Sequence, residues 1–316
     1  MKPGTTPLSL PLTLISLLSA CGGADTAKEA PSSSAAAPAA IDATSAGVQV
    51  TAHDFSFDAP DSIASGWTRF RFENQGSQTH FFVLDHLPDG RTLDDFIAAA
   101  ALPFDSAWHG LESGALDKAQ AGALLGKLLP PWFAGVEQTG GAGLLAPGGS
   151  VIATVHLDPG TYVMECYVKA PDGTFHTSFG MARQLDVAAV ERKAPEPTED
   201  LAITFNADGM KAPAQVVAGD HTVAVHYEVQ PPAGTLANDV HVARLSDGMD
   251  PEDLVPWMDW MNVDGLRAPA PATFLGGVQE VPQGGTAYFT LALTPGRYAW
   301  ISENAERGMV QGFTVR

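Results

Sequence analysis

The sequence predicts an all-β fold of two similar β-sandwiches in tandem, each interrupted by a small helical insert. Two observations predict it. Polar and apolar residues alternate in stretches such as Thr68–Phe72 and Val151–Leu157, and a period of two is typical of a half-buried strand. Residues 140–166 also align without gaps on residues 276–302, and a repeat of this length indicates two copies of one domain.

The N-terminal residues 1–21 predict a bacterial lipoprotein signal peptide. Their apolar run, Leu8–Leu18, is too short to span a membrane and long enough for the core of a signal peptide. It ends in Leu-Ser-Ala-Cys-Gly, which resembles a lipobox whose Cys21 carries the lipid. Because Gly22 follows instead of Asp, the resemblance implies a lipid anchor in the outer membrane, with the protein facing the periplasm of the cell envelope. The alternative is an ordinary secretory signal with an incidental cysteine.

Composition divides the rest of the chain. Residues 22–46 are mostly Ala, Ser, Pro, Thr and Asp with almost no large apolar side chain, which predicts a disordered tether. The first sandwich is expected at residues 47–187 and the second at residues 200–316. Between them, residues 188–199 are charged, contain proline and show no apolar periodicity, which is typical of a linker.

Helix-capping sequences place the helical insert of each copy. Thr92 and Asp95 form a capping-box pattern that predicts the start of a short helix. Asp250 and Asp253 repeat the pattern, with a proline in the first turn. The first copy adds a second helix, expected near residues 115–129.

The chain is strongly acidic. Its 17 basic and 36 acidic side chains give a formal net charge of −19. Nucleic acid is therefore not an expected partner, and neither is an anionic membrane surface. A basic protein partner fits the charge, although the acidity could also serve solubility alone.

Cys166, His176 and Met181 lie in one short stretch, with the spacing C-x9-H-x4-M, at the end of a strand-like segment. A soft thiolate, an imidazole and a thioether suit copper above other metals, and a second His would complete the set. His80, at the end of a loop after an alternating strand, is the best candidate. Alone, Cys166 could be a buried inert thiol. If Cys21 carries lipid, however, metal ligation explains a lone thiol in an oxidising compartment.

At these residues the chain resembles the cupredoxins, the small blue copper proteins. In that family a first His follows an Asn-containing loop, as His80 follows Asn74 here, and the Cys, the second His and the Met share a later loop. The resemblance spans roughly residues 47–187, and weaker similarity continues to the C-terminus. It implies Greek-key β-sandwiches of the cupredoxin type and one type 1 copper ion. The residues that match the family's ligands are His80, Cys166, His176 and Met181.

The second copy lacks this ligand set. Ser302 aligns with Cys166, and the sequence HVARL at His241 aligns with HFFVL at His80. Met309 aligns with the methionine of the first copy, but eight residues before it are missing, and the second His with them. The second copy is therefore expected to hold no blue copper and to serve structure or docking.

Alternation along the last strand of the first repeat predicts which side chains face inward. Tyr162, Met164 and Cys166 share one face of the strand, and Glu165 lies on the other. Cys166 is therefore expected to face the core and Glu165 the solvent. His86 could lie near the metal or on the surface.

Outside the copper motif, one other group of residues could bind a metal. Met258 and Met261 could form a copper(I) site, or they could pack as a helix face against the sheet.

Three functions fit the sequence. The first is a type 1 copper electron-transfer lipoprotein with a redox partner protein in the cell envelope. The second is a lipoprotein that binds or delivers copper without redox cycling, and the third is a metal-free interaction module. The chain has no His-x-His pair for a trinuclear copper site, and no nucleophile elbow, Walker loop or dinucleotide fingerprint, so it is not expected to be an enzyme.

Overall fold

The computed structural model describes residues 47–232 and 236–316. The signal sequence, Cys21 and the tether predicted at 22–46 lie outside the described residues, and the predicted segment boundaries stay predictions. Among the helices of the described part, none is long and apolar enough to span a membrane.

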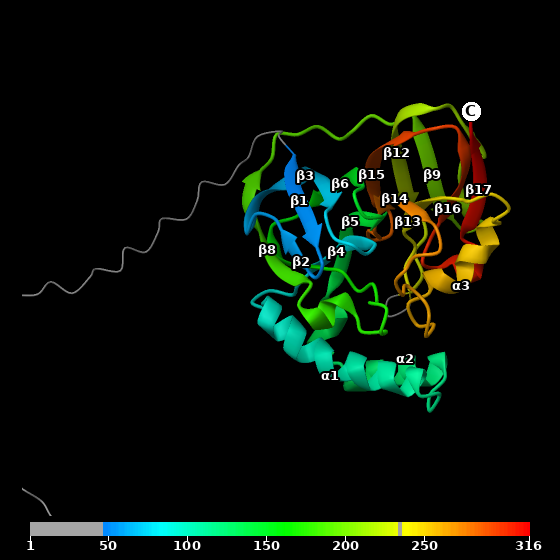
Figure 1. Ribbon diagram of the computed structural model, residues 1–316. Helices are drawn as coiled ribbons and strands as arrows, with labels where there is room; N and C mark the ends of the chain where they lie inside the picture. Colours follow the sequence, from blue (N-terminus) through cyan, green and yellow to red (C-terminus); the bar gives the residue numbers. More distant parts are fainter. Residues whose placement is uncertain (1–46, 233–235) are drawn as a thin grey trace, which may run out of the picture. The chain divides into compact units, whose positions relative to one another are not determined.

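The first half of the structure, residues 48–191, is a sandwich of two sheets (Figure 1). One sheet has the strand order β2–β1–β3–β6, and the other has the order β8–β7–β4–β5. The strands are β1 Val48–His53, β2 Ser56–Asp58, β3 Ser62–Asn74, β4 His80–His86, β5 Glu137–Leu145, β6 Ser150–Leu157, β7 Gly160–Glu165 and β8 Ala182–Glu191.

The second half, residues 201–315, repeats this arrangement. Its sheets have the orders β10–β9–β12–β15 and β11–β17–β16–β13–β14. The strands are β9 Leu201–Asn206, β10 Gly209–Lys211, β11 Gln215–Val216, β12 Gly219–Tyr227, β13 Val240–Arg244, β14 Thr273–Val278, β15 Thr286–Leu293, β16 Gly296–Ile301 and β17 Val310–Val315. The predicted fold class, two cupredoxin-like β-sandwiches in tandem with helical inserts, is confirmed.

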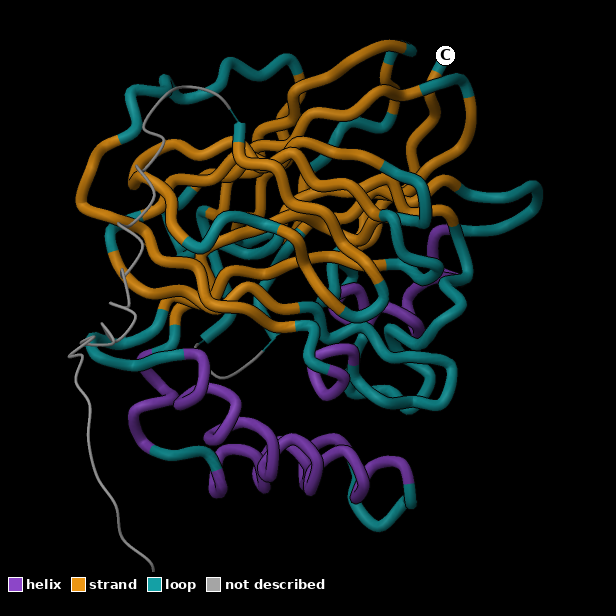
Figure 2. The backbone as a smooth tube through the Cα atoms, turned by 60° about the vertical axis from the view of Figure 1, so that its left-hand side comes forward, coloured by secondary structure: helices purple, strands orange, loops and turns teal. Residues whose placement is uncertain are grey.

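Helices interrupt each half where the capping patterns predicted them. Thr92 and Asp95 form the capping box of α1, and Asp250 and Asp253 form that of η3. Figures 1 and 2 show α1 and α2 together below the strands. The helices are α1 Leu93–Glu112, α2 Lys118–Leu128, η1 Pro131–Gly135, η2 His176–Phe179, η3 Pro251–Leu254, α3 Val255–Met258 and η4 Ala305–Arg307.

The apolar residues of the alternating strands fill the space between the sheets. In the first half, Phe82 packs edge-on against Phe70 and Phe72, and all three side chains are fully buried. In the second half, Trp300 stacks on Phe313. Burying a large aromatic side chain contributes about 2–3 kcal/mol, so these rings stabilise each sandwich and fix the strand faces.

The two halves are joined strand to strand in both sheets. β6 pairs antiparallel with β15, where Ala153 lies opposite Phe289, and β5 pairs antiparallel with β14, where Ala142 lies opposite Val278. Each pair joins residues that are equivalent in the sequence repeat. The two pairings, called the seam below, therefore have an approximate two-fold symmetry like that of a dimer interface.

Candidate metal centre

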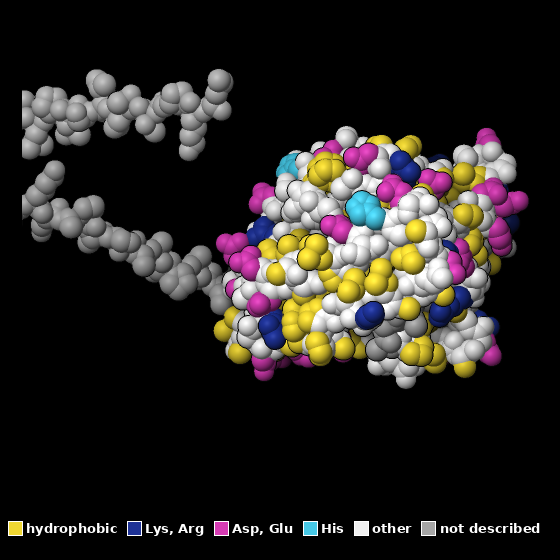
Figure 3. Space-filling view, turned by 90° about the horizontal axis from the view of Figure 1, so that it is seen from below, with side chains coloured by type: hydrophobic (Ala, Val, Ile, Leu, Met, Phe, Trp, Pro, Cys, Tyr) yellow, Lys and Arg dark blue, Asp and Glu magenta, His cyan; other side chains and the backbone are white. Residues whose placement is uncertain are grey.

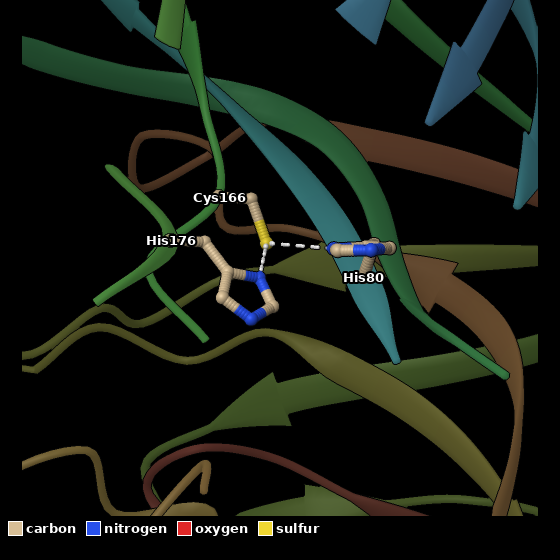
Figure 4. Close-up of side chains that lie close together, drawn as sticks. All are labelled: His80, Cys166 and His176. Atoms are coloured by element: carbon tan, nitrogen blue, oxygen red, sulfur yellow. Dashed lines mark hydrogen bonds between the residues drawn. The ribbon is translucent and has the colours of Figure 1, made fainter. Parts of the chain in front are cut away.

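Three side chains that are distant in the sequence meet at one end of the first sandwich. The Sγ atom of Cys166 lies 3.8 Å from Nδ1 of His80 and 3.6 Å from Nδ1 of His176 (Figure 4). The three atoms lie within 4.8 Å of one another, and all three side chains are fully buried.

Backbone hydrogen bonds fix the ligand loop, residues 166–181, on which three of the four predicted ligands lie. The amide of Cys166 donates to the carbonyl of Met181 (3.1 Å), and the amide of Met181 donates to the carbonyl of His176 (3.0 Å). The side chain of Met181 is fully buried. Asn74 closes the opposite loop, because its Nδ2 atom donates to the carbonyl of Gln78 (2.8 Å), two residues before His80.

The hydrogen bonds of His80 determine which of its nitrogens is free. Its Nε2 atom lies 2.7 Å from Oδ1 of Asp54, whose other oxygen accepts from the amide and hydroxyl of Ser77 at 2.9 and 2.5 Å. Burial raises the pKa of Asp54, but these hydrogen bonds and His80 outweigh it and lower the pKa to about 2. An ionised carboxylate only accepts, so Nε2 carries the proton and Nδ1 presents its lone pair to Cys166.

His176 has the same tautomer for an analogous reason. Its Nε2 atom donates to the side-chain carbonyl of Gln78 at 3.2 Å. The Nδ1 atom is then unprotonated and faces the sulfur of Cys166. Two imidazole lone pairs and one sulfur therefore converge, and each imidazole is oriented through its second nitrogen, as is usual for metal-ligating histidines.

Burial keeps the three groups neutral in the absence of a metal ion. It raises the pKa of the Cys166 thiol to about 12. It also lowers the pKa of His80, despite the opposing effect of Asp54, and together with His80 it lowers the pKa of His176 to about 3. The histidines are thus available as neutral ligands, whereas a metal ion must displace the thiol proton.

The donor set selects among metals. One thiolate and two imidazoles, with a buried thioether on the same loop, match the preferences of copper, and zinc also accepts thiolate and imidazole. The residues present therefore fit a copper ion held by His80, Cys166 and His176, with Met181 on the loop that closes the site.

Comparisons with known proteins found similar proteins among solved structures. No family model and no curated protein matches the chain. A reduced auracyanin from Roseiflexus castenholzii is 17% identical, and the match covers 47% of this chain and 99% of the auracyanin with a TM-score of 0.26. Auracyanin A, a blue copper protein from Chloroflexus aurantiacus, is 17% identical over 45% of this chain and 98% of its own, with a TM-score of 0.27.

A third similar structure extends over both halves. Blue copper oxidase from Nitrosomonas europaea is 12% identical over 85% of this chain and 84% of its own, with a TM-score of 0.22. The chain resembles the blue copper cupredoxins. With TM-scores this low the matches carry no argument about function, and the proposals below rest on the residues of this chain.

Two polar residues of the site were not predicted from the sequence. Asp54 braces His80 from the turn between β1 and β2, and Gln78 braces His176 from the loop before β4. Neither has a distinctive spacing from the ligands. For Gln78 a sequence signal exists, because the polar stretch Gln-Gly-Ser-Gln-Thr just before His80 offers hydrogen-bond acceptors.

The prediction that Glu165 faces solvent was wrong. The side chain is half-buried, accepts a hydrogen bond from the Thr177 hydroxyl (3.2 Å) and lies next to the buried Asp85. Burial raises the pKa of Glu165 to about 7. Alternation placed this residue on the outer face correctly, but that face is covered, so it is not exposed.

The predicted equivalence of His241 and His80 was also wrong. In the first half Val83 pairs with Glu165 of β7 and with Gly141 of β5, and in the second half His241 pairs with the equivalents of those two residues. His241 therefore takes the place of Val83. By the same register, Asn238 takes the place of His80.

Hydrogen bonds within the second half fill the position of the metal centre. The hydroxyl of Ser302, which replaces Cys166, donates to Asp239 (2.7 Å) and accepts from the amide of Asn304 (3.1 Å). The side chain of Asn304 donates to that of Asn238 (3.1 Å). The polar groups at this place are thus bonded to one another, and the set has no soft ligand.

A second cluster, Asp239, His241 and Glu303, brings three potential ligating atoms within 4.8 Å of one another. However, the amide of Leu144 donates to Nδ1 of His241 (3.0 Å), so the proton lies on Nε2, which faces Asp239 at 2.5 Å. A neutral imidazole has only one unprotonated nitrogen. In His241 that nitrogen is Nδ1, so Nε2 has no lone pair to offer a metal ion. With this tautomer the cluster is not a metal centre. His241 instead connects the two halves through its hydrogen bond with Leu144.

Proposed function

We propose that this chain is a type 1 copper electron-transfer protein of the bacterial cell envelope, anchored by lipid on Cys21. The observation that supports this most directly is the convergence of one thiol sulfur and two unprotonated imidazole nitrogens, all buried. Bound copper would supply a one-electron redox couple. The protein would supply ligands whose positions are fixed by hydrogen bonds, so that little has to move when an electron arrives or leaves.

Burial favours electron transfer over copper delivery and over substrate turnover. His80, Cys166 and His176 have no solvent-exposed surface. Delivery would require these ligands to be reached by an acceptor, and turnover would require an open coordination position. We therefore propose that the chain is not an enzyme and does not release its metal as part of its function.

A chain of aromatic contacts leads from the site to the surface. Phe55 lies against His176, with ring centroids 4.8 Å apart, and stacks on Phe179 at 4.6 Å. Phe179 is 47% exposed. Next to it, a hollow of about 460 Å³ lies between α1 and the ligand loop, lined by residues such as Ile97 and Thr177.

This face of the protein is the proposed contact for a redox partner. Figure 3 views the molecule from the side of α1 and α2 and shows hydrophobic side chains gathered there. The large exposed ones on the two helices are Ile97, Leu102 and Leu128. An apolar contact surrounded by an acidic protein of net charge −19 suits a partner with an apolar patch and a basic rim.

Copper loading tests the function. The purified protein should bind one Cu(II) per chain and show an intense visible absorption band from the thiolate. Reduction and reoxidation should remove and restore that band without loss of metal. A protein that stays colourless with Cu(II) under oxidising conditions would contradict the electron-transfer function.

Fractionation of cells tests the location. Wild-type protein should be found with the outer membrane, and Cys21→Ala should release it or stall its processing, because the lipid is attached through this thiol. Equal membrane retention of the two proteins would show that something other than lipid on Cys21 holds the chain there.

A further inference from the structure

Hydrogen bonds from the second half hold the ligand loop of the first half. The amide of Lys169 donates to the carbonyl of Leu266 (2.8 Å), and the amide of Ala268 donates to the carbonyl of Lys169 (2.8 Å). Arg267 donates two side-chain hydrogen bonds to the carbonyl of Pro171, at 3.0 and 2.6 Å. The part of the loop between Cys166 and His176 thus extends a strand-like pairing across the two halves.

The side chain of Lys169 anchors the same contact from inside. It is fully buried, and its Nζ atom donates to the carbonyls of Trp260 (2.8 Å) and Asn262 (2.7 Å). The ammonium group also lies 3.9 Å from the ring centre of Trp108 on α1. Burial lowers the pKa of Lys169 to about 7. One lysine therefore joins the ligand loop, the helical insert and the second half through carbonyl oxygens and a cation–π contact.

The gripping segment, residues 257–268, is itself held in place. The indole of Trp257 donates to the carbonyl of Arg267 (2.7 Å) and its ring stacks on Phe274. The amide of Leu266 donates back to the carbonyl of Trp257. The segment is therefore a closed loop packed on the second sandwich, and its carbonyl groups are fixed acceptors for Lys169.

The held part of the loop is hydrogen-bonded to the predicted metal ligand His176. Within the loop, the amide of His176 donates to the carbonyl of Val168 (2.8 Å), and the amide of Ala170 donates to the carbonyl of Thr174 (2.8 Å). His176 is thus bonded directly to the residue next to Lys169. The second half lacks eight residues between Ser302 and Met309, so its loop at this place is much shorter than the ligand loop.

We infer that residues 257–268 of the second half act as a clamp on the ligand loop, with Lys169 as a positioning residue for His176. This inference rests on the proposed copper site for its functional meaning, but the clamp itself is a property of the metal-free protein. It gives the second half a specific role, which is to keep the long loop in one conformation.

The reaction rate of the Cys166 thiol with a disulfide reagent, measured in metal-free protein, tests the clamp. Because the thiol is buried, the reagent reaches it only when the loop opens. Lys169→Met should raise the rate about tenfold, which corresponds to a loss of about 1.4 kcal/mol in the free energy of opening. Arg267→Met, at a partly exposed position where folding is less at risk, should raise it by a smaller factor. Lys127→Met, at an exposed lysine of α2, is the matched control and should leave it unchanged.

A spectroscopic measurement separates positioning from general loosening. In copper-loaded protein, Lys169→Met should shift the energy of the thiolate band or the electron paramagnetic resonance parameters, and Lys127→Met should not. Normally folded Lys169→Met and Arg267→Met proteins with wild-type thiol reactivity would overturn the clamp. If Lys169→Met fails to fold, the Arg267→Met protein decides. A wild-type protein without a visible band would count against the proposed function and leave the thiol measurement to decide the clamp.

Discussion

The two halves have the same backbone arrangement around Cys166 and Ser302, but the side chains that surround these two residues differ. In the first half the amide of Cys166 donates to Met181, and in the second half the amide of Ser302 donates to Met309, at 3.1 and 3.0 Å. Around the thiol lie two imidazoles with unprotonated Nδ1 atoms, whereas the hydroxyl is hydrogen-bonded to Oδ1 of Asp239 and to the amide of Asn304. The comparison shows that the sandwich holds the position, and that a metal centre needs unsatisfied, converging donors in addition.

The largest expected effect comes from exchanging the central residue of each half. Cys166→Ser should abolish the visible copper band, because a hydroxyl does not replace a soft thiolate. Ser302→Cys should create no such band, since Asn238 takes the place of His80 and the second half lacks the segment that carries the second His. Absorption spectra of both variants after Cu(II) loading test the comparison. A blue Ser302→Cys protein that lacks Cys166 would show that the second half retains a working site.

A smaller loss is expected from the residue that orients His80. Asp54→Ala removes the acceptor of the Nε2 proton, so either ring nitrogen can then carry it. The affinity for copper should fall about 10- to 100-fold, the usual effect of removing such a partner. Asp58→Ala, at a neighbouring exposed position, is the control. Competition with a copper chelator measures the affinities, and equal values for Asp54→Ala and wild type would contradict the tautomer assignment.

The buried carboxylates of the second half should make stability depend on pH. Burial, and then the nearby Asp239, raise the pKa of Glu280 from 4.5 to about 8. Because the folded state holds this proton more tightly, the stabilising contribution is complete below pH 4.5 and is lost as the pH rises to about 8. The slope from one such group is at most about 1.4 kcal/mol per pH unit.

Glu280→Gln should flatten this dependence and raise the free energy of unfolding at pH 8. Urea unfolding between pH 5 and pH 8 measures it, with Glu252→Gln at an exposed site as the control. If both variants keep the wild-type slope, another group titrates in this range.

The smallest effect concerns the thioether. Met181→Leu should keep copper bound, because the thiol and the two imidazoles remain, and should raise the reduction potential, because a thioether that would stabilise Cu(II) is removed. Voltammetry of the two copper-loaded proteins compares the potentials. A lower potential in the variant would show that the Met181 thioether does not stabilise Cu(II) at this site.

The features that the sequence predicts correctly are local ones. The strands, the capping boxes and the grouping of Cys166, His176 and Met181 depend on spacing within short segments, which the sequence displays directly. Asp54 and Gln78 could not be found in this way, since what makes them partners of the histidines is the folding of separate turns onto one end of the sandwich.

The misplaced His241 shows how the repeat can mislead. Similar letters, HVARL and HFFVL, suggested one alignment, but the register is set by glycines. Gly141 and Gly277 have positive φ angles of 145° and 141°, and a side chain on either would collide with the carbonyl of Phe82 or Val240, respectively. These backbone contacts make Val240 the equivalent of Phe82 in the repeat, so His241 does not lie at the position of His80.

The seam also changes how the molecule should be regarded as an assembly. Its two strand pairings have the geometry of a symmetric dimer interface. The chain therefore resembles a dimer whose two subunits are covalently linked in one polypeptide. Covalent joining keeps the partner at high effective concentration, and it removes the requirement that both partners carry the same site. A half separated from its partner would expose the edges of two strands, which are templates for pairing with another chain. One partner is thereby free to serve as a scaffold while the other carries the metal centre.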